Sequence, residues 1–244
     1  MNKKIKLLIA VGGTGGHVLP GCNLAKNLIK DNFEINIVTD KRGARFIESF
    51  RNLDFYILPS KPIIKNNFIT ILFSIMFLSY AILRSIIFLL IRRPSLVFGM
   101  GGYASFPICI AAKLLNIRFI IYENNLVVGK ANKYLLPFAS KVFVSFRDLE
   151  GIEEKYIDKV KEIGNIINPD IINFPKNNLH NKQFSKFKIL VLGGSQAAEI
   201  FANVLPEIFI RCIKEKIPIE VYQQCLSNQE QRLSSLYKND AITL

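Results

Sequence analysis

The stretch IKLLIAVGGTGGH, residues 5–17, decides the fold class of this 244-residue chain. A mainly apolar run ends in a glycine-rich turn, and a helix-like segment follows at residues 20–30. Strands buried on both faces of a parallel sheet produce such runs. A strand that turns through glycines into a helix leaves unpaired backbone N–H groups at the positive helix end. The stretch therefore predicts a βα unit of an α/β fold with an anion-binding turn.

The same pattern recurs twice, as GMGGY at residues 99–103 and as GGSQ at residues 193–196. Each of these turns also follows a short apolar run and precedes a helix-like segment. One glycine turn is a weak signal, but three in one chain indicate a protein that handles a substrate with a diphosphate group.

Strands are expected to alternate with helices along the chain, which is typical of βαβ units and parallel sheets. Strand-like runs lie at 5–11, 35–39, 55–58, 96–98, 118–122, 142–146, 188–192 and 220–223, and helix-like segments at 20–30, 44–50, 106–115, 130–136 and 197–216. Residues 165–186 are rich in Asn, Pro and Lys and are expected to form a linker. We expect domains at 1–163 and 164–244, the second incomplete because it supplies too few strands for a doubly wound layer.

The charge and the apolar residues are unevenly distributed. The net charge is +13, and no acidic residue occurs between Asp54 and Glu123. Within that stretch, residues 68–91 are apolar apart from Arg84 and a few hydroxyl residues, and they are long enough to span a bilayer. Three interpretations stay open: one or two buried helices in a domain core, a helix or hairpin in the membrane interface beside anionic lipid, or a true span. Nucleic-acid binding is disfavoured because the bases follow no recognisable binding motif.

Several common site types are excluded or disfavoured. Val18 stands where a G-x-G-x-x-G dinucleotide fingerprint needs glycine, although Asp40 would suit a ribose-binding acid and leaves a nicotinamide alternative open. No P-loop is present, and GSQA at 194–197 departs from a nucleophile elbow. The four cysteines form no C-x-x-C pair, so a zinc site is not expected. We expect them to be reduced thiols of a cytosolic protein. The N-terminus lacks the pattern of a signal peptide, which indicates a cytoplasmic protein.

His17 and Glu123 are the candidate catalytic residues. A histidine at a helix N-terminus is expected to have a lowered pKa and to be neutral, able to accept a proton or to bind a phosphate. Alternatively, His17 only packs the loop. Glu123 follows a strand, so it should emerge at the carboxyl edge of the sheet, where open α/β folds bind ligands, or it only balances the surrounding bases. No D-x-D pair occurs, so a metal-held diphosphate is not indicated.

Four motifs resemble, in order and spacing, those of the MurG glycosyltransferases: VGGTGGHVLP at 11–20, GMGGYASFP at 99–107, ENN at 123–125 with Gly129 and Asn132-Lys133, and LGGSQ at 192–196. The resemblance implies a GT-B fold of two Rossmann-like domains, the second incomplete here. It also implies inverting transfer of N-acetylglucosamine from UDP-N-acetylglucosamine to undecaprenyl-diphosphate-linked lipid I, which forms lipid II for peptidoglycan. Such enzymes need no metal or other cofactor and lie peripherally on the cytoplasmic face of the bacterial inner membrane.

The resemblance also assigns residues by position. Thr14, Gly15, Gly16, Asn125 and Ser195 are expected to contact the donor, and His17 and Tyr103 to lie in the cleft near the acceptor. The family's apolar, base-rimmed membrane patch falls in the acid-free stretch. Asn168 stands where the family usually has an arginine, and the family sequence continues well beyond residue 244. The alternative is therefore a non-catalytic, membrane-associated remnant that binds lipid-linked diphosphate.

Overall fold

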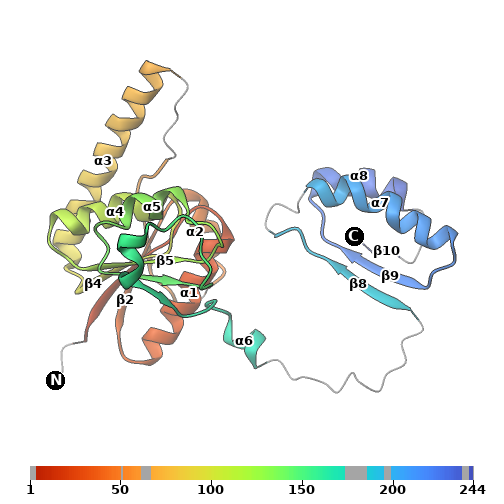
Figure 1. Ribbon diagram of the computed structural model, residues 1–244, viewed down its shortest axis with the longest axis horizontal. Coiled ribbons are helices and arrows are strands. Elements are labelled where there is room, and N and C mark those ends of the chain that lie inside the picture. The colour runs from red at the N-terminus through yellow and green to blue at the C-terminus, as the bar shows by residue number, and fades with distance from the viewer. Residues whose placement is uncertain are drawn as a thin grey trace. The chain divides into compact units, whose positions relative to one another are not determined.

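The computed structural model describes residues 4–50, 52–61, 67–173, 186–194 and 199–237, together with the backbone of 242–243. The chain separates into two compact units, Met1–Phe174 and Pro175–Leu244 (Figure 1). The boundary expected after residue 163 lies before this division. Each unit is considered by itself.

The first unit contains a seven-stranded parallel sheet with the strand order β3-β2-β1-β4-β5-β6-β7. The strands are β1 (Lys6–Ala10), β2 (Glu34–Thr39), β3 (Phe55–Ile57), β4 (Leu96–Gly99), β5 (Phe119–Glu123), β6 (Lys141–Val144) and β7 (Val160–Glu162). The order runs one way from β1 to β3 and the other way from β4 onward, so a topological switch point lies between β1 and β4. In doubly wound folds, ligands bind outside the carboxyl ends of the strands at this point.

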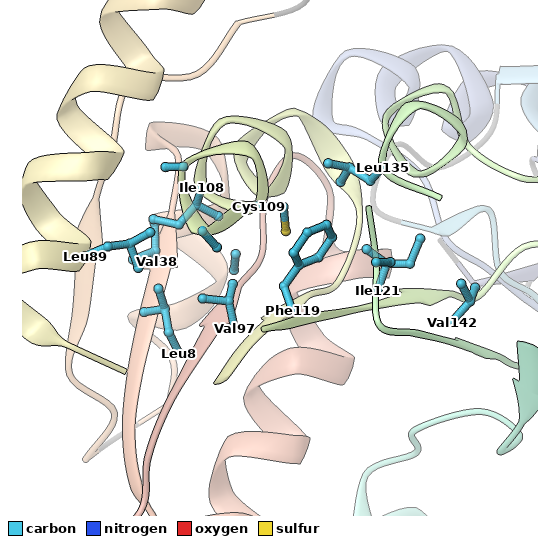
Figure 2. Close-up of a cluster of buried hydrophobic side chains, with 14 of the residues drawn as sticks. Leu8, Val38, Leu89, Val97, Ile108, Cys109, Phe119, Ile121, Leu135 and Val142 are labelled. Atoms are coloured by element: carbon cyan, nitrogen blue, oxygen red, sulfur yellow. The ribbon is translucent and has the colours of Figure 1, made fainter. Parts of the chain in front are cut away.

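Helices cover both faces of this sheet. They are α1 (Gly15–Lys30), α2 (Lys41–Ile47), α3 (Phe68–Arg92), α4 (Gly102–Leu114), α5 (Lys130–Leu135) and α6 (Pro169–Ile172), with a 3₁₀ helix at Glu154–Lys159. Alternate residues of β1 belong to different cores: Leu8 packs with α3, α4 and α5, whereas Ile9 packs with α1 and α2. Figure 2 shows the first of these cores, where side chains from the strands meet Leu89 of α3, Ile108 and Cys109 of α4, and Leu135 of α5.

The segment 68–91 is neither a pair of helices nor a core helix. It forms part of the single helix α3, whose only fully buried side chains are Ala81, Ser85 and Leu89, one turn apart on one face. None of residues 68–80 is buried, and α3 is long and apolar enough to cross a membrane. In Figure 1 its upper end rises clear of the other helices of the unit. The expectation of a core helix was therefore wrong for the first half of α3.

Other expectations differ from the structure at the ends of elements. Helix α1 begins at Gly15, before the expected start at residue 20, and it contains Pro20 in its sixth position. The short strand β7 and the 3₁₀ helix were missed because both are brief and largely polar. The expected linker 165–186 includes α6, while its residues 174–185 lie outside the described part of the chain.

The second unit contains a three-stranded parallel sheet with the order β10-β9-β8. Its elements are β8 (Phe187–Val191), α7 (Glu199–Lys214), β9 (Ile219–Gln223), α8 (Ser227–Leu236) and β10 (Ile242–Thr243). A small core gathers around Phe209, Val221 and Leu233. The expected restart of the βα pattern after the linker is confirmed.

Candidate functional site

The first two glycine turns lie against each other at the switch point of the first unit. A Cβ atom on Gly102 would lie 2.5 Å from the carbonyl oxygen of Gly12, and one on Gly12 would lie 2.5 Å from the Cβ of Ala104. Gly102 also has a φ of +76°. Any side chain at these positions would push the turns apart. The glycines therefore allow the N-termini of α1 and α4 to approach each other closely, which concentrates two positive helix ends in one place.

Thr14, Gly15 and Gly16 form the start of α1. Thr14 is the N-cap residue with an extended backbone, and its side chain makes no capping hydrogen bond. Gly15 is buried beside Phe46, whereas Gly16 is exposed. Gly16 has room for a close ligand, since a Cβ there would meet only the Thr14 hydroxyl, at 3.7 Å.

The Asp40 carboxylate holds the first glycine turn through hydrogen bonds. Its Oδ1 accepts hydrogen bonds from the backbone N–H of Gly43 (2.8 Å) and Gly13 (3.2 Å), and its Oδ2 accepts from Arg42 Nη2 (3.0 Å). Burial raises the pKa of Asp40, but these two amides and the Arg42 guanidinium outweigh burial and hold the pKa below its ordinary value. With its lone pairs engaged in this way, Asp40 caps α2 and anchors the turn, which disfavours the ribose-binding alternative.

His17 bridges the two glycine turns. Its imidazole lies against Gly101, where a Cβ atom would be 3.0 Å from Nδ1. Nδ1 is buried and has no hydrogen-bond partner among the described residues. Burial lowers the pKa of His17, and the Glu123 charge and the nearby Met100 backbone offset this only in part. The lowered pKa agrees with the expectation, and burial is its largest cause.

Glu123 organises the loop that follows β5. Its side chain is buried, and Oε1 accepts hydrogen bonds from the backbone N–H (3.1 Å) and Nδ2 (2.6 Å) of Asn125. Oε2 accepts from the backbone N–H of Gly129 (2.8 Å) and from Nδ2 of buried Asn132 (2.9 Å). Each oxygen thus already receives two N–H groups. A proton acceptor needs a free lone pair, so this arrangement suits a positioning role better than that of a base.

The remaining expected site residues are spread over several elements. Tyr103, in the first turn of α4, and Asn125 are both exposed. Ser195 lies outside the described residues, but the adjacent turn is held by a residue that sequence reasoning missed: Gln224 Oε1 accepts a hydrogen bond from the Gly193 N–H (3.0 Å). Among the described residues, no group of three or more His, Cys, Asp and Glu could hold a metal ion.

Asn124 and Asn132 belong to the third sequence motif, but the sequence assigned no contact to them or to Tyr122. Asn124 Nδ2 donates to the carbonyl oxygen of Gly16 (2.8 Å) and so ties the loop after β5 to α1. The Tyr122 hydroxyl lies 2.6 Å from Ser145 Oγ and donates to the Gly164 carbonyl (3.1 Å), which fixes the segment after β7. Spacing alone gives no signal for these contacts, because they join residues far apart in sequence.

A parallel sheet whose strand order reverses beside a pair of glycine turns defines a doubly wound α/β ligand-binding unit. Residues 7–144, more than half of the chain, match the glycosyltransferase family 28 N-terminal domain. The chain therefore belongs to glycosyltransferase family 28.

Several relatives with similar sequences carry the same name, UDP-N-acetylglucosamine–N-acetylmuramyl-(pentapeptide) pyrophosphoryl-undecaprenol N-acetylglucosamine transferase. The protein of this name from Pelagibacter ubique is 33% identical over 99% of this chain, and that from Rickettsia felis is 31% identical over 95%. The chain spans 65% of the length of each of these relatives.

Solved structures show the same fold. MurG of Acinetobacter baumannii superposes with a TM-score of 0.72 at 22% identity, over 98% of this chain and 67% of that one. The Staphylococcus aureus MnaA–UDP structure superposes with a TM-score of 0.66 at 16% identity, over 98% of this chain and 68% of that one. The α/β fold class of GT-B type, which the sequence motifs implied, is thereby confirmed.

Proposed function

We propose that this chain carries the acceptor-binding part of an inverting glycosyltransferase, which moves N-acetylglucosamine from UDP-N-acetylglucosamine to undecaprenyl-diphosphate-linked lipid I. The shared name of relatives that match nearly the whole chain supports this proposal. The observation that carries it is the contact between the two glycine turns, Gly12 against Gly102. Two helix N-termini side by side suit a diphosphate, and helix-end amides stabilise charge that develops on it.

In the proposed reaction, the acceptor's 4-hydroxyl attacks the anomeric carbon from the face opposite UDP. The new C–O bond forms as the bond to the UDP oxygen breaks, and a base takes the hydroxyl proton. His17 is our candidate base because its lowered pKa keeps it neutral and it lies between the two turns. Glu123, the second candidate, acts in this proposal by holding the loop that carries Asn125.

The other site residues take binding roles in the proposal. Thr14, Gly15, Gly16, Asn125 and Ser195 contact the nucleotide-sugar donor, and Tyr103 lies near the acceptor. No cofactor or metal is assigned a role. We place the reaction at the cytoplasmic face of the bacterial inner membrane, where peptidoglycan precursors linked to lipid are made.

We further propose that the free half of α3 holds the protein peripherally on an anionic membrane. Residues 68–80 extend about 20 Å at about 1.5 Å per residue. This is less than the ~30 Å hydrocarbon core of a bilayer, and the helix beyond residue 80 packs into the domain, so the free half enters one leaflet rather than spanning. The chain between Asp54 and Glu123 carries only positive charges, which favours anionic lipid.

An activity assay tests the proposed reaction. This chain, and the same chain extended by the part of the Pelagibacter relative that it does not match, are each incubated with labelled UDP-N-acetylglucosamine and a lipid I analogue. Turnover by the extended chain supports the proposal, and its loss in His17→Ala supports the assigned base. If the Pelagibacter enzyme turns over in parallel but neither form of this chain does, the remnant alternative replaces the enzyme.

Vesicle co-sedimentation tests the membrane proposal. We expect binding that increases with the anionic lipid fraction and weakens with salt, because salt screens exposed charges over ~8 Å at physiological ionic strength. Phe73→Asp should abolish binding, whereas Ile200→Asp, an equally exposed apolar position in the second unit, should not. Resistance to alkaline carbonate extraction would show an integral protein and contradict the peripheral placement.

A further inference from the structure

Pro20, in the second turn of helix α1, cannot donate the hydrogen bond that a carbonyl group of the first turn would normally accept. In an α-helix each N–H donates to the carbonyl four residues earlier, so residue 20 would normally donate to Gly16. Pro20 has no N–H, and its ring clashes with the carbonyl of residue i−4. The Gly16 carbonyl therefore lacks its helical partner.

That carbonyl receives a side chain from 108 residues further along the chain. Asn124 Nδ2 donates to the Gly16 oxygen at 2.8 Å. The second unit repeats the arrangement: Pro206 lies inside α7, the carbonyl four residues earlier belongs to Ala202, and Arg232 Nη2 donates to it at 2.8 Å. In both helices the carbonyl that a proline leaves open is used for a tertiary contact.

The Asn124 contact joins two parts of the site that are otherwise built separately. Glu123 holds the backbone of Asn125 and Gly129 from the sheet side. Asn124 holds the same loop to the first turn of α1, beside His17. Without it, no hydrogen bond among the described residues links the loop 124–129 to α1.

We propose that Pro20 is a positioning residue. It keeps the Gly16 carbonyl open for Asn124 and thereby fixes the loop 124–129 against the glycine turn of α1. The role in catalysis rests on the function proposed above, but the coupling between Pro20 and the loop does not. Alanine at position 20 restores the helical N–H, which competes with Asn124 for the Gly16 carbonyl and weakens the hold of Asn124 on the loop.

Hydrogen exchange of the 124–129 amides tests this coupling in the full chain, with no substrate required. Pro20→Ala and Asn124→Ala should each increase exchange there by roughly 2- to 12-fold, the range expected for loss of one hydrogen bond. The double variant should show no more than the larger single effect, because both changes remove the same contact. Pro206→Ala is the matched control and should leave these amides unchanged.

The melting temperature separates positioning from a structural role. Pro20→Ala should leave it unchanged or raise it, since alanine restores a helix bond, even as the loop loosens. In the extended chain, Pro20→Ala should lower kcat, and Asn124→Gln should retain more activity than Asn124→Ala. Unchanged loop exchange in Pro20→Ala, additive effects in the double variant, or the same effect from Pro206→Ala would each overturn the proposal, whatever the activity assay gives.

Discussion

Replacing Glu123 by glutamine should destabilise the first unit by about 2–3 kcal/mol. The carboxylate accepts four hydrogen bonds, two at each oxygen, from Asn125, Gly129 and Asn132. Glutamine keeps one acceptor oxygen, which we expect to stay with Gly129 and Asn132 because Asn132 is buried. Two charge-assisted bonds to Asn125 are then lost, at about 1.5–3 kcal/mol each. The two bonds together would contribute about 3–6 kcal/mol, but Asn125 is exposed and its N–H groups can turn to water, so the cost falls to or below the lower end of that sum.

Calorimetry can measure this cost. For a unit of this size, 1 kcal/mol shifts the melting temperature by roughly 2–4 °C, so Glu123→Gln should lower it by about 4–12 °C. The two units can melt separately, and the change should appear only in the transition of the first. Glu150→Gln is the control, since it makes the same chemical change at an exposed carboxylate. Equal melting temperatures for the two variants would refute the view that Glu123 organises the loop.

Four further outcomes follow from contacts within the first unit. In an NMR titration, His17 should have a pKa below its ordinary value, and Glu123→Gln should lower it further because a charge that raises it is removed; no further fall would contradict their proximity. Because folding lowers the pKa of His17, the unfolded chain takes up a proton more readily, and the free energy of unfolding should fall as the pH falls below about 6.5. A His17→Gln variant whose free energy of unfolding has the same slope against pH would contradict this. Leu89→Ala should lower the free energy of unfolding by about 2–5 kcal/mol, whereas Phe73→Ala should change it by no more than about 0.5 kcal/mol. Equal changes would contradict a free outer half of α3. Asp40→Asn should be destabilising at pH 7. Because folding lowers the pKa of Asp40, the unfolded chain takes up a proton first as the pH falls below about 3.9, and the difference in stability should shrink there; a pH-independent difference would contradict the lowered pKa.

Residues 5–17 predicted the βα unit correctly because the signals are local. A strand buried on both faces must be apolar throughout, and a tight turn into a helix requires glycine, so both leave a mark in a short stretch. The first two glycine turns and most strands of the first sheet followed from this rule. The starts of α1 and α4 were placed too late, because glycine and proline weaken the helical pattern where these helices begin.

The amino-acid sequence by itself determined the α/β class, the parallel strands and the positions of the glycine turns, since each depends on neighbours within a few residues. Only the tertiary structure decided that Gly12 and Gly102 lie in close contact and that the Glu123 carboxylate accepts its hydrogen bonds from the loop that follows it. It also decided that the first half of α3 buries no side chain in the core. These facts depend on contacts between residues up to about a hundred positions apart, such as Asn124 with Gly16. Hydrophobic periodicity reports which face of a segment is apolar, but burial and hydrogen bonding depend on which other segment comes to meet that face.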